Sequence, residues 1–387
     1  MTMMYHERLI GVGIASLLTG ACAADGAVDE PVTEPVTELT QALTTCGWGD
    51  AGYVRTGYFN PGKQLDVVSP DGNVVHTYRG GHPFVYDARA VTEGWGAAGY
   101  TWAGDFDGDG LTDLASASGG NVRMKLSHGT GFDSETWVVP NEWGPTGFTF
   151  AADFSGDGLT DIASAEGDVI QYHISTNQGF TNKAVAVTDE WGSAGNTFAA
   201  DFTGDHKADI ASVSGNNVYM KIATATGTGF TSKTWPVADE WGTSGNTFVA
   251  DFTGDGKADI ASASGDKVYM KVAAATGDGF ISEAWPVTNA WGSSSYTFVA
   301  DFNGDGLPDI ASADGNNIYM KLSVKQPDGT GSSFTSQTWV INSPWGAAGF
   351  TRAGDFDGDG LADIVTFDGC RVTLHRSTGT GFVTDIY

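Results

Sequence analysis

The chain has 387 residues, which leaves room for several small domains or for one large β domain. It carries 47 acidic and 19 basic side chains, and its formal net charge is −28. This balance argues against a nucleic-acid partner, because phosphates are bound by basic surfaces. The acidic residues are concentrated in one repeated motif, which favours a role in metal ligation. The alternative is that they keep the protein soluble.

Residues 1–21 are expected to be an export signal. A short polar start is followed by the apolar run Leu9–Leu18, which is too short to span a bilayer. The small residues before Cys22 resemble the bacterial lipoprotein cleavage box, although Thr19 stands where Leu is usual. We expect an exported chain that contacts the membrane only through a lipid on Cys22, as an outer-membrane or cell-surface lipoprotein. The alternative is a secreted protein cleaved near Ala21–Ala24.

Residues 22–45 are expected to be a tether. The stretch VDEPVTEPVTEL within it is acidic, contains proline and lacks aromatic residues. Such a segment cannot bury enough apolar surface to fold, so we expect it to stay extended. The folded part of the chain is then residues 46–387.

A nine-residue motif occurs six times in the folded part. The first copy reads DFDGDGLTD, with oxygen-bearing side chains at positions 1, 3, 5 and 9. Hard cations such as Ca²⁺ take about six to eight oxygen ligands. Glycine stands at position 6 in five of the copies, where it lets the chain turn through positive φ so that the oxygens converge. We therefore expect about six structural calcium ions, in the loops Asp105–Asp113, Asp153–Asp161, Asp201–Asp209, Asp251–Asp259, Asp301–Asp309 and Asp355–Asp363.

The motif recurs at intervals of 48, 48, 50, 50 and 54 residues, a period typical of propellers and solenoids. A Trp-Gly pair recurs in step with it and marks the start of seven units, at Trp48, Trp95, Trp143, Trp191, Trp241, Trp291 and Trp345. The first unit has no complete motif. Its stretch Tyr58–Asp66 keeps Asn60 and Asp66 but has Gly62 at position 5. We expect this blade to bind no metal.

Each unit divides into four short segments rich in Val, Ile, Tyr, Phe, Thr and Trp, the residues favoured in strands. In the fifth unit the predicted strands are Asn246–Phe252, Ala258–Ser264, Lys267–Ala273 and Ser282–Thr288. Seven units of four strands predict an all-β fold, a seven-bladed β-propeller of antiparallel blades. A linear β-solenoid is the alternative.

Two cysteines are left after Cys22. Cys46 enters blade one, and Cys370 lies in the turn between the second and third strands of blade seven. In a closed ring these positions lie on the same face of neighbouring blades, and export permits a disulfide. We expect a Cys46–Cys370 bridge that locks the seam; the alternative is two free thiols.

The loop DF-x-GDG-xx-D between two strands resembles the FG-GAP (VCBS-type) repeats of integrin α-subunit propellers and of many bacterial surface proteins. The resemblance implies calcium bound by the side chains at positions 1, 3, 5 and 9 and by the carbonyl at position 7. We expect a weaker site where His206 replaces glycine, because histidine tolerates the left-handed backbone conformation better than most residues. An EF-hand is excluded, since position 12 holds Ser or Thr in place of Glu. The implied ligands are Asp105, Asp107, Asp109, Leu111, Asp113, Asp153, Ser155, Asp157, Leu159, Asp161, Asp201, Thr203, Asp205, Lys207, Asp209, Asp251, Thr253, Asp255, Lys257, Asp259, Asp301, Asn303, Asp305, Leu307, Asp309, Asp355, Asp357, Asp359, Leu361 and Asp363.

Two further columns of residues repeat with the blades. One is basic and lies on the third strand, at Lys125, His173, Lys221, Lys271, Lys321 and His375. The other is tryptophan on the fourth strand, at Trp137, Trp235, Trp285 and Trp339. A Trp face beside a polar donor suits a sugar ring, and some mushroom lectins that resemble this family bind sugars between blades. The alternative is that both columns pack between blades, with cation–π contact.

We expect a calcium-binding extracellular or cell-surface module, monomeric, that binds a carbohydrate or a protein and has no catalytic activity. The motifs G-x-S-x-G and the P-loop do not occur, and the seven histidines form no recognisable triad. A multivalent lectin with sites between blades is the first alternative. An enzyme is the second, and its place would be the irregular blade one, where Arg55, His76, His82 and Asp87 are the unusual polar residues.

Overall fold

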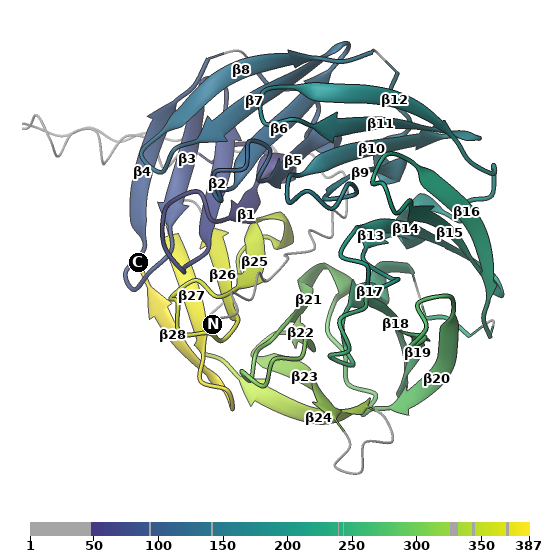
Figure 1. The fold of residues 1–387 in the computed structure, drawn as a ribbon. Helices are drawn as coiled ribbons and strands as arrows, with labels where there is room; N and C mark the ends of the chain where they lie inside the picture. The colour runs from purple at the N-terminus through teal and green to yellow at the C-terminus, as the bar shows by residue number, and fades with distance from the viewer. Residues whose placement is uncertain are drawn as a thin grey trace, which may run out of the picture.

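The computed structural model describes residues 48–92, 94–140, 142–238, 240–242, 244–325, 332–342, 345–368 and 371–387. Its strands form seven four-stranded antiparallel sheets arranged in a ring (Figure 1). In every sheet the strand order follows the chain, so each blade is one continuous segment. The predicted all-β seven-bladed propeller is confirmed. Within the described residues, no helix is long and apolar enough to cross a bilayer.

The bounds of the strands follow the repeat. Blade one has β1 (Arg55–Gly57), β2 (Asp66–Asp71), β3 (Val74–Arg79) and β4 (Val85–Ala90). Blade two has β5 (Thr101–Gly104), β6 (Asp113–Ser118), β7 (Asn121–Ser127) and β8 (Phe132–Val138). Blade three has β9 (Thr149–Ala152), β10 (Asp161–Glu166), β11 (Val169–Ser175) and β12 (Phe180–Ala186). Blade four has β13 (Thr197–Ala200), β14 (Asp209–Ser214), β15 (Asn217–Ala223) and β16 (Phe230–Pro236).

Blade five has β17 (Thr247–Ala250), β18 (Asp259–Ser264), β19 (Lys267–Ala273) and β20 (Phe280–Pro286). Blade six has β21 (Thr297–Ala300), β22 (Asp309–Asp314), β23 (Asn317–Lys325) and β24 (Ser332–Val340). Blade seven has β25 (Thr351–Gly354), β26 (Asp363–Asp368), β27 (Arg371–Ser377) and β28 (Phe382–Ile386). A three-residue 3₁₀ turn precedes each first strand, at η1 (Ala51–Tyr53), η2 (Ala98–Tyr100), η3 (Thr146–Phe148), η4 (Ala194–Asn196), η5 (Ser244–Asn246), η6 (Ser294–Tyr296) and η7 (Ala348–Phe350).

The fifth blade shows how the sequence pattern maps onto the strands. Its third strand has the predicted bounds, whereas its fourth begins two residues earlier, at Phe280. The first strand is shorter than predicted, because Asn246 belongs to the 3₁₀ turn and Phe252 already belongs to the loop. The second strands are buried on both faces, which explains their small and apolar sequence, DIASAS in this blade.

The Trp-Gly pair joins each blade to the one before it. The indole Nε1 of Trp241 donates to the carbonyl of Gly215, in the β14–β15 turn of the preceding blade, at 2.7 Å. The same bond is made by Trp95, Trp143, Trp191, Trp291 and Trp345. The glycine that follows packs directly on the second strand of its own blade, where its N–H donates to a buried hydroxyl, as Gly242 does to Ser262 at 2.8 Å.

The ring closes without strand exchange. Blade one contacts blade seven through two backbone bonds, from Leu65 N to Asp355 O (2.9 Å) and from Gly81 N to Phe356 O (2.6 Å). At the same seam Trp48 stacks on Tyr78, with ring centroids 4.3 Å apart. Residues 1–47 and Cys370 lie outside the described residues, so the signal, the tether, the lipidated Cys22 and the Cys46–Cys370 bridge stay predictions.

The glycine of the Trp-Gly pair can be tested with two alanine variants in one linker. A Cβ at Gly192 would lie 1.9 Å from the carbonyl oxygen of Val213, so Gly192→Ala should lower the free energy of unfolding by about 1–3 kcal/mol. Gly195→Ala is the matched control, because no atom lies within 4 Å of its Cβ position. Urea unfolding of both variants measures the difference; equal midpoints would contradict this packing.

Candidate calcium sites

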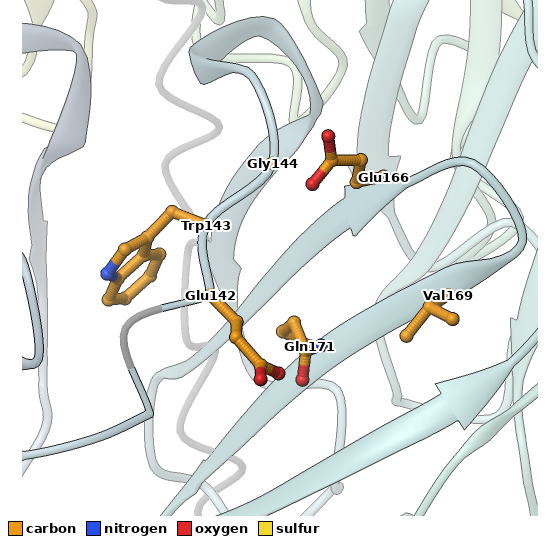
Figure 2. A pocket seen from close by; sticks show the side chains of 6 residues that line it. All are labelled: Glu142, Trp143, Gly144, Glu166, Val169 and Gln171. Carbon is orange, nitrogen blue, oxygen red and sulfur yellow. The ribbon is translucent and has the colours of Figure 1, made fainter.

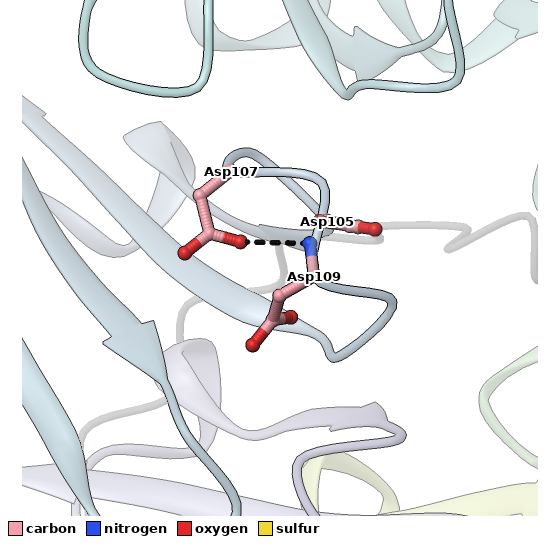
Figure 3. A group of neighbouring side chains, drawn as sticks. All are labelled: Asp105, Asp107 and Asp109. Atoms are coloured by element: carbon pink, nitrogen blue, oxygen red, sulfur yellow. Dashed lines mark hydrogen bonds between the residues drawn. The ribbon is translucent and has the colours of Figure 1, made fainter.

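Each nine-residue motif forms the loop between the first and second strands of its blade. In the loop between β5 and β6, Asp105 accepts two backbone hydrogen bonds, from Gly108 N (2.7 Å) and from Gly110 N (3.0 Å). Asp107 accepts one from Asp109 N (3.1 Å), the bond drawn in Figure 3. These bonds wrap the backbone around the carboxylates, so the side chains at positions 1, 3 and 5 face a common centre.

The oxygens converge as a metal site requires. Ligand atoms of Asp105, Asp107 and Asp109 all lie within 4.8 Å of one another, and so do those of Asp355, Asp357 and Asp363. The other four loops have Ser155, Thr203, Thr253 or Asn303 at position 3. They keep the same frame, because the first aspartate accepts a bond from the N–H of residue 6 in all six loops. A purely oxygen donor set fits a hard cation such as calcium.

His206 keeps the turn that glycine makes in the other loops. Its φ is 65°, and its N–H donates to Asp201 Oδ2 at 2.7 Å. The five glycines at this position have φ between 84° and 92°. The expectation that histidine tolerates this left-handed conformation agrees with the structure, so this loop retains the frame of a site.

The aspartate at position 9 is fully buried in all six loops. In Asp113, Oδ1 accepts from Ser127 N on the third strand (2.7 Å) and Oδ2 accepts from Phe106 N (2.9 Å). Burial raises the pKa of Asp113 and Asp363 to about 8. It raises the pKa of the equivalent residues to about 7, in Asp161, Asp209, Asp259 and Asp309. Their ionised forms are therefore costly unless a cation lies close by.

The loops are also joined to one another around the ring. The N–H of residue 8 in one loop donates to the carbonyl of residue 1 in the preceding loop, as from Ala258 to Asp201 at 2.8 Å. Equivalent bonds of 2.7–2.9 Å join five other pairs of neighbouring blades, counting the incomplete loop of blade one. Pro308 has no N–H, so the bond is missing between blades five and six.

Blade one fills its loop with a side chain of its own. Arg89, on β4, is 5% exposed and donates from Nη2 to Asn60 Oδ1 at 2.7 Å. Asn60 in turn donates to Asp66 Oδ2 at 2.7 Å. The guanidinium of Arg89 is therefore hydrogen-bonded to the side-chain oxygen at position 3, and the metal-free blade stays a prediction.

The tryptophan and lysine columns lie in the interior. Trp137, Trp235, Trp285 and Trp339 are each 4% exposed and pack edge-on against a phenylalanine of the next blade, at 5.0–5.2 Å between ring centroids. Lys125, Lys221, Lys271 and Lys321 are fully buried, and each ammonium lies over a linker tryptophan, at 4.4–5.1 Å from the ring centroid. As placed, these eight side chains cannot stack on a sugar. The packing alternative describes them, and the proposal of ligand-binding columns is corrected accordingly.

The unusual polar residues of blade one have separate partners. Arg55 donates only to backbone carbonyls, among them those of Gly52 and Thr101. His76 pairs with Tyr86 (2.8 Å), and His82 pairs with Asp385 (3.1 Å). Asp87 is paired with Arg89 (3.2 Å). The structure gives these residues no common site.

A hollow of about 590 Å³, which the sequence pattern does not predict, opens beside the linker into blade three. Figure 2 shows its lining, which includes Trp143, the carboxylates of Glu142 and Glu166, and the amide of Gln171. The residue equivalent to Gln171 is tyrosine in blades four to six, at Tyr219, Tyr269 and Tyr319. Blades one, two and seven also lack this tyrosine and have His76, Arg123 and Thr373, so the position alone did not single out blade three in the sequence.

The buried aspartates predict how stability depends on pH in the metal-free protein. Their pKa rises from 3.8 to about 7–8 on folding, so the folded state holds protons that the unfolded state releases. Raising the pH from about 4 to about 8 should therefore lower the melting temperature in EDTA. Excess calcium should flatten this slope, and thermal melts across the range compare the two. A melting temperature in EDTA that stays level or rises would contradict the prediction.

The comparisons with known proteins agree with this geometry. The model of the FG-GAP-like repeat matches residues 105–164, 153–212, 201–262, 251–312 and 301–366. Comparison with the curated proteins finds none that matches.

Several solved structures are similar to this chain at low sequence identity. An Agrocybe aegerita lectin that recognises non-reducing terminal N-acetylglucosamine has a TM-score of 0.63 at 19% identity, over 88% of this chain and 90% of the lectin. The Photorhabdus luminescens Tc holotoxin pore has 0.48 at 15%, over 83% of this chain and 17% of the other. The V. cholerae biofilm matrix protein Bap1 has 0.33 at 12%, over 84% and 76%. The family match spans more than half of the residues, and the chain belongs to the FG-GAP-like repeat family.

Proposed function

We propose that this protein is an exported, calcium-loaded propeller that acts as a non-catalytic binding or adhesion module on a cell surface. The observation that carries the calcium assignment is the convergence of oxygen donors in loops that share one backbone frame. Side chains at positions 1, 3, 5 and 9 would hold the ion together with the carbonyl at position 7.

The proposed export and lipidation at Cys22 would be tested by palmitate labelling with Cys22→Ser as the control.

Calcium in these loops would have a structural effect. Each loop concentrates three or four carboxylates, which repel one another without a cation. Because each loop also bonds to the next blade through residue 8, a change in one loop reaches the seam between two blades. Loaded loops would stiffen the face of the ring on which they lie, and a stiff face loses less conformational entropy when it binds a partner.

A lectin is the second candidate, favoured by the hollow at blade three. Glu142, Glu166 and Gln171 offer acceptors for sugar hydroxyls. Trp143 adds an indole to the lining, although His173 and Trp102 pack against its ring at 4.9 Å and 6.0 Å between centroids. The Agrocybe aegerita lectin that shares the fold recognises terminal N-acetylglucosamine. The equivalent position holds tyrosine in blades four to six, and His76, Arg123 and Thr373 in blades one, two and seven. We therefore propose one sugar site at blade three instead of a ring of equivalent sites.

The calcium assignment predicts a loss of one ion from a double variant. Asp355→Asn with Asp357→Asn removes two converging carboxylates and should lower the bound calcium from about six ions to about five. The melting temperature in calcium should fall, while that in EDTA should fall less or rise. The control is Asp168→Asn with Asp266→Asn, which makes the same charge change in turns outside the loops. Native mass spectrometry counts the ions; an unchanged count in the first variant would refute the loop assignment.

The lectin candidate predicts selective binding that depends on the hollow. The full chain should bind a subset of glycans on an array in calcium, and Gln171→Tyr should abolish that binding by filling the space. Thr231→Tyr, on the exposed side of β16, adds the same ring elsewhere and should leave binding intact. A blank array from the folded, calcium-loaded protein would leave protein adhesion as the proposed role.

A further inference from the structure

Some of the loops contain a cation supplied by the chain itself. We propose that these side chains set the calcium affinity of each loop, so that the ring has two classes of site. On the proposed calcium function, the loops Asp201–Asp209 and Asp251–Asp259 are the weak class. The loops that begin at Asp105, Asp153, Asp301 and Asp355 are the tight class.

The lysine at position 7 marks the weak class. Lys207 Nζ lies 3.1 Å from Asp205 Oδ2, and Lys257 Nζ lies 3.0 Å from Asp255 Oδ2. Both partners are position-5 carboxylates, which the family pattern uses as ligands. In the other four loops position 7 is leucine. The ammonium groups therefore take up an oxygen that calcium would need.

These lysines are held in place by the neighbouring blade. The stem of Lys207 fills the space beside Gly156 in the preceding loop, and that of Lys257 fills the space beside Gly204. Their side chains are only 15% and 13% exposed. An ammonium confined in this way cannot move far when a divalent ion enters, so it repels the ion across a short distance. We expect this repulsion to raise the calcium dissociation constant of each lysine loop about tenfold.

Charge counts order the loops in the same way. The side chains at positions 1–9 sum to −4 in the loops from Asp105 and Asp355, to −3 in those from Asp153 and Asp301, and to −2 in the two lysine loops. A second ammonium also approaches the Asp251 loop, since Lys325 Nζ donates to Gly254 O at 3.3 Å. The two loops with four aspartates lie on either side of blade one. A guanidinium also approaches one of them, since Arg376 Nη1 lies 3.5 Å from Asp357 Oδ2. Its Nε is paired with Asp385 at 2.8 Å and its side chain is 27% exposed, so it is less confined than the two lysines and we keep this loop in the tight class.

Blade one is the extreme case, because a buried arginine of the chain lies in its loop. The guanidinium of Arg89 contacts Asn60, the position-3 residue, and also donates to the carbonyl of Gly129 in the next blade at 3.1 Å. Because Arg89 is buried and bonded on both sides of the seam, it fixes the loop without an ion. Confined cations of the chain are thus absent from the loops of the tight class, are lysines in the weak class, and are replaced by a buried arginine in blade one.

The test is a calcium titration of the full chain by isothermal calorimetry, with Lys207→Met and Lys257→Met combined. Methionine keeps an apolar stem over the glycines and removes the ammonium. The unmodified protein should show two weak sites beside a tighter class, and in the variant these two should bind about tenfold more tightly with the total unchanged. The control is Lys233→Met with Lys267→Met, two exposed lysines of the same blades.

A converse variant covers the case in which the first does not fold. Leu159 contacts Gly108 as Lys207 contacts Gly156, so Leu159→Lys should weaken one tight site about tenfold. Equal affinity at every site of the unmodified protein, or the same shift in variant and control, would overturn the two classes while leaving calcium binding intact. No calcium binding at all would instead refute the proposed function.

Discussion

The buried aspartate at the start of each second strand is the residue on which both the fold and the loops depend. In every blade its Oδ1 accepts a backbone bond from the end of the third strand, from Ser127 in blade two and from Gly80 in blade one. Its other oxygen is bonded within the loop before it. One carboxylate thus joins the loop, the second strand and the third strand. Blade one retains it as Asp66, although the other acidic ligands there are gone.

The same carboxylate joins the fold to the proposed metal chemistry of the loops. Removing it from water favours its protonated form, and its neighbours in the loop are aspartates as well. In the proposed calcium-loaded protein a bound cation would offset this cost, and in blade one the guanidinium of Arg89 lies in the loop instead. In the two lysine loops an ammonium of the chain partly neutralises the carboxylates.

Much of the fold could be predicted from the sequence, because repetition reveals it. The Trp-Gly spacing gave the number of blades, since each pair makes the same contact with the preceding blade. The positions of the loops were predicted equally well, because their backbone hydrogen bonds are made by residues within the nine-residue motif. The roles of Trp137 and Lys221 were left open. Residues that stack on a ligand and residues that pack between blades recur at the same interval along the chain. The hollow at Gln171 and the ion pair of Lys207 were missed, because the repeat pattern does not show how much space a side chain leaves beside its strand or which oxygen of a loop an ammonium reaches.

Proline at position 308 has a consequence for how the ring can deform. Between blades five and six it removes the backbone bond that the other neighbouring pairs make. Ser323 Oγ, whose counterparts Ser127, Ser175 and Ser377 reach back to the preceding blade, bonds instead to Pro308 O within its own blade. At this seam a side chain makes the connection instead, since Lys325 Nζ of blade six donates to Gly254 O of blade five at 3.3 Å. A lysine side chain can yield more easily than a backbone bond, so the ring should deform most easily between these two blades.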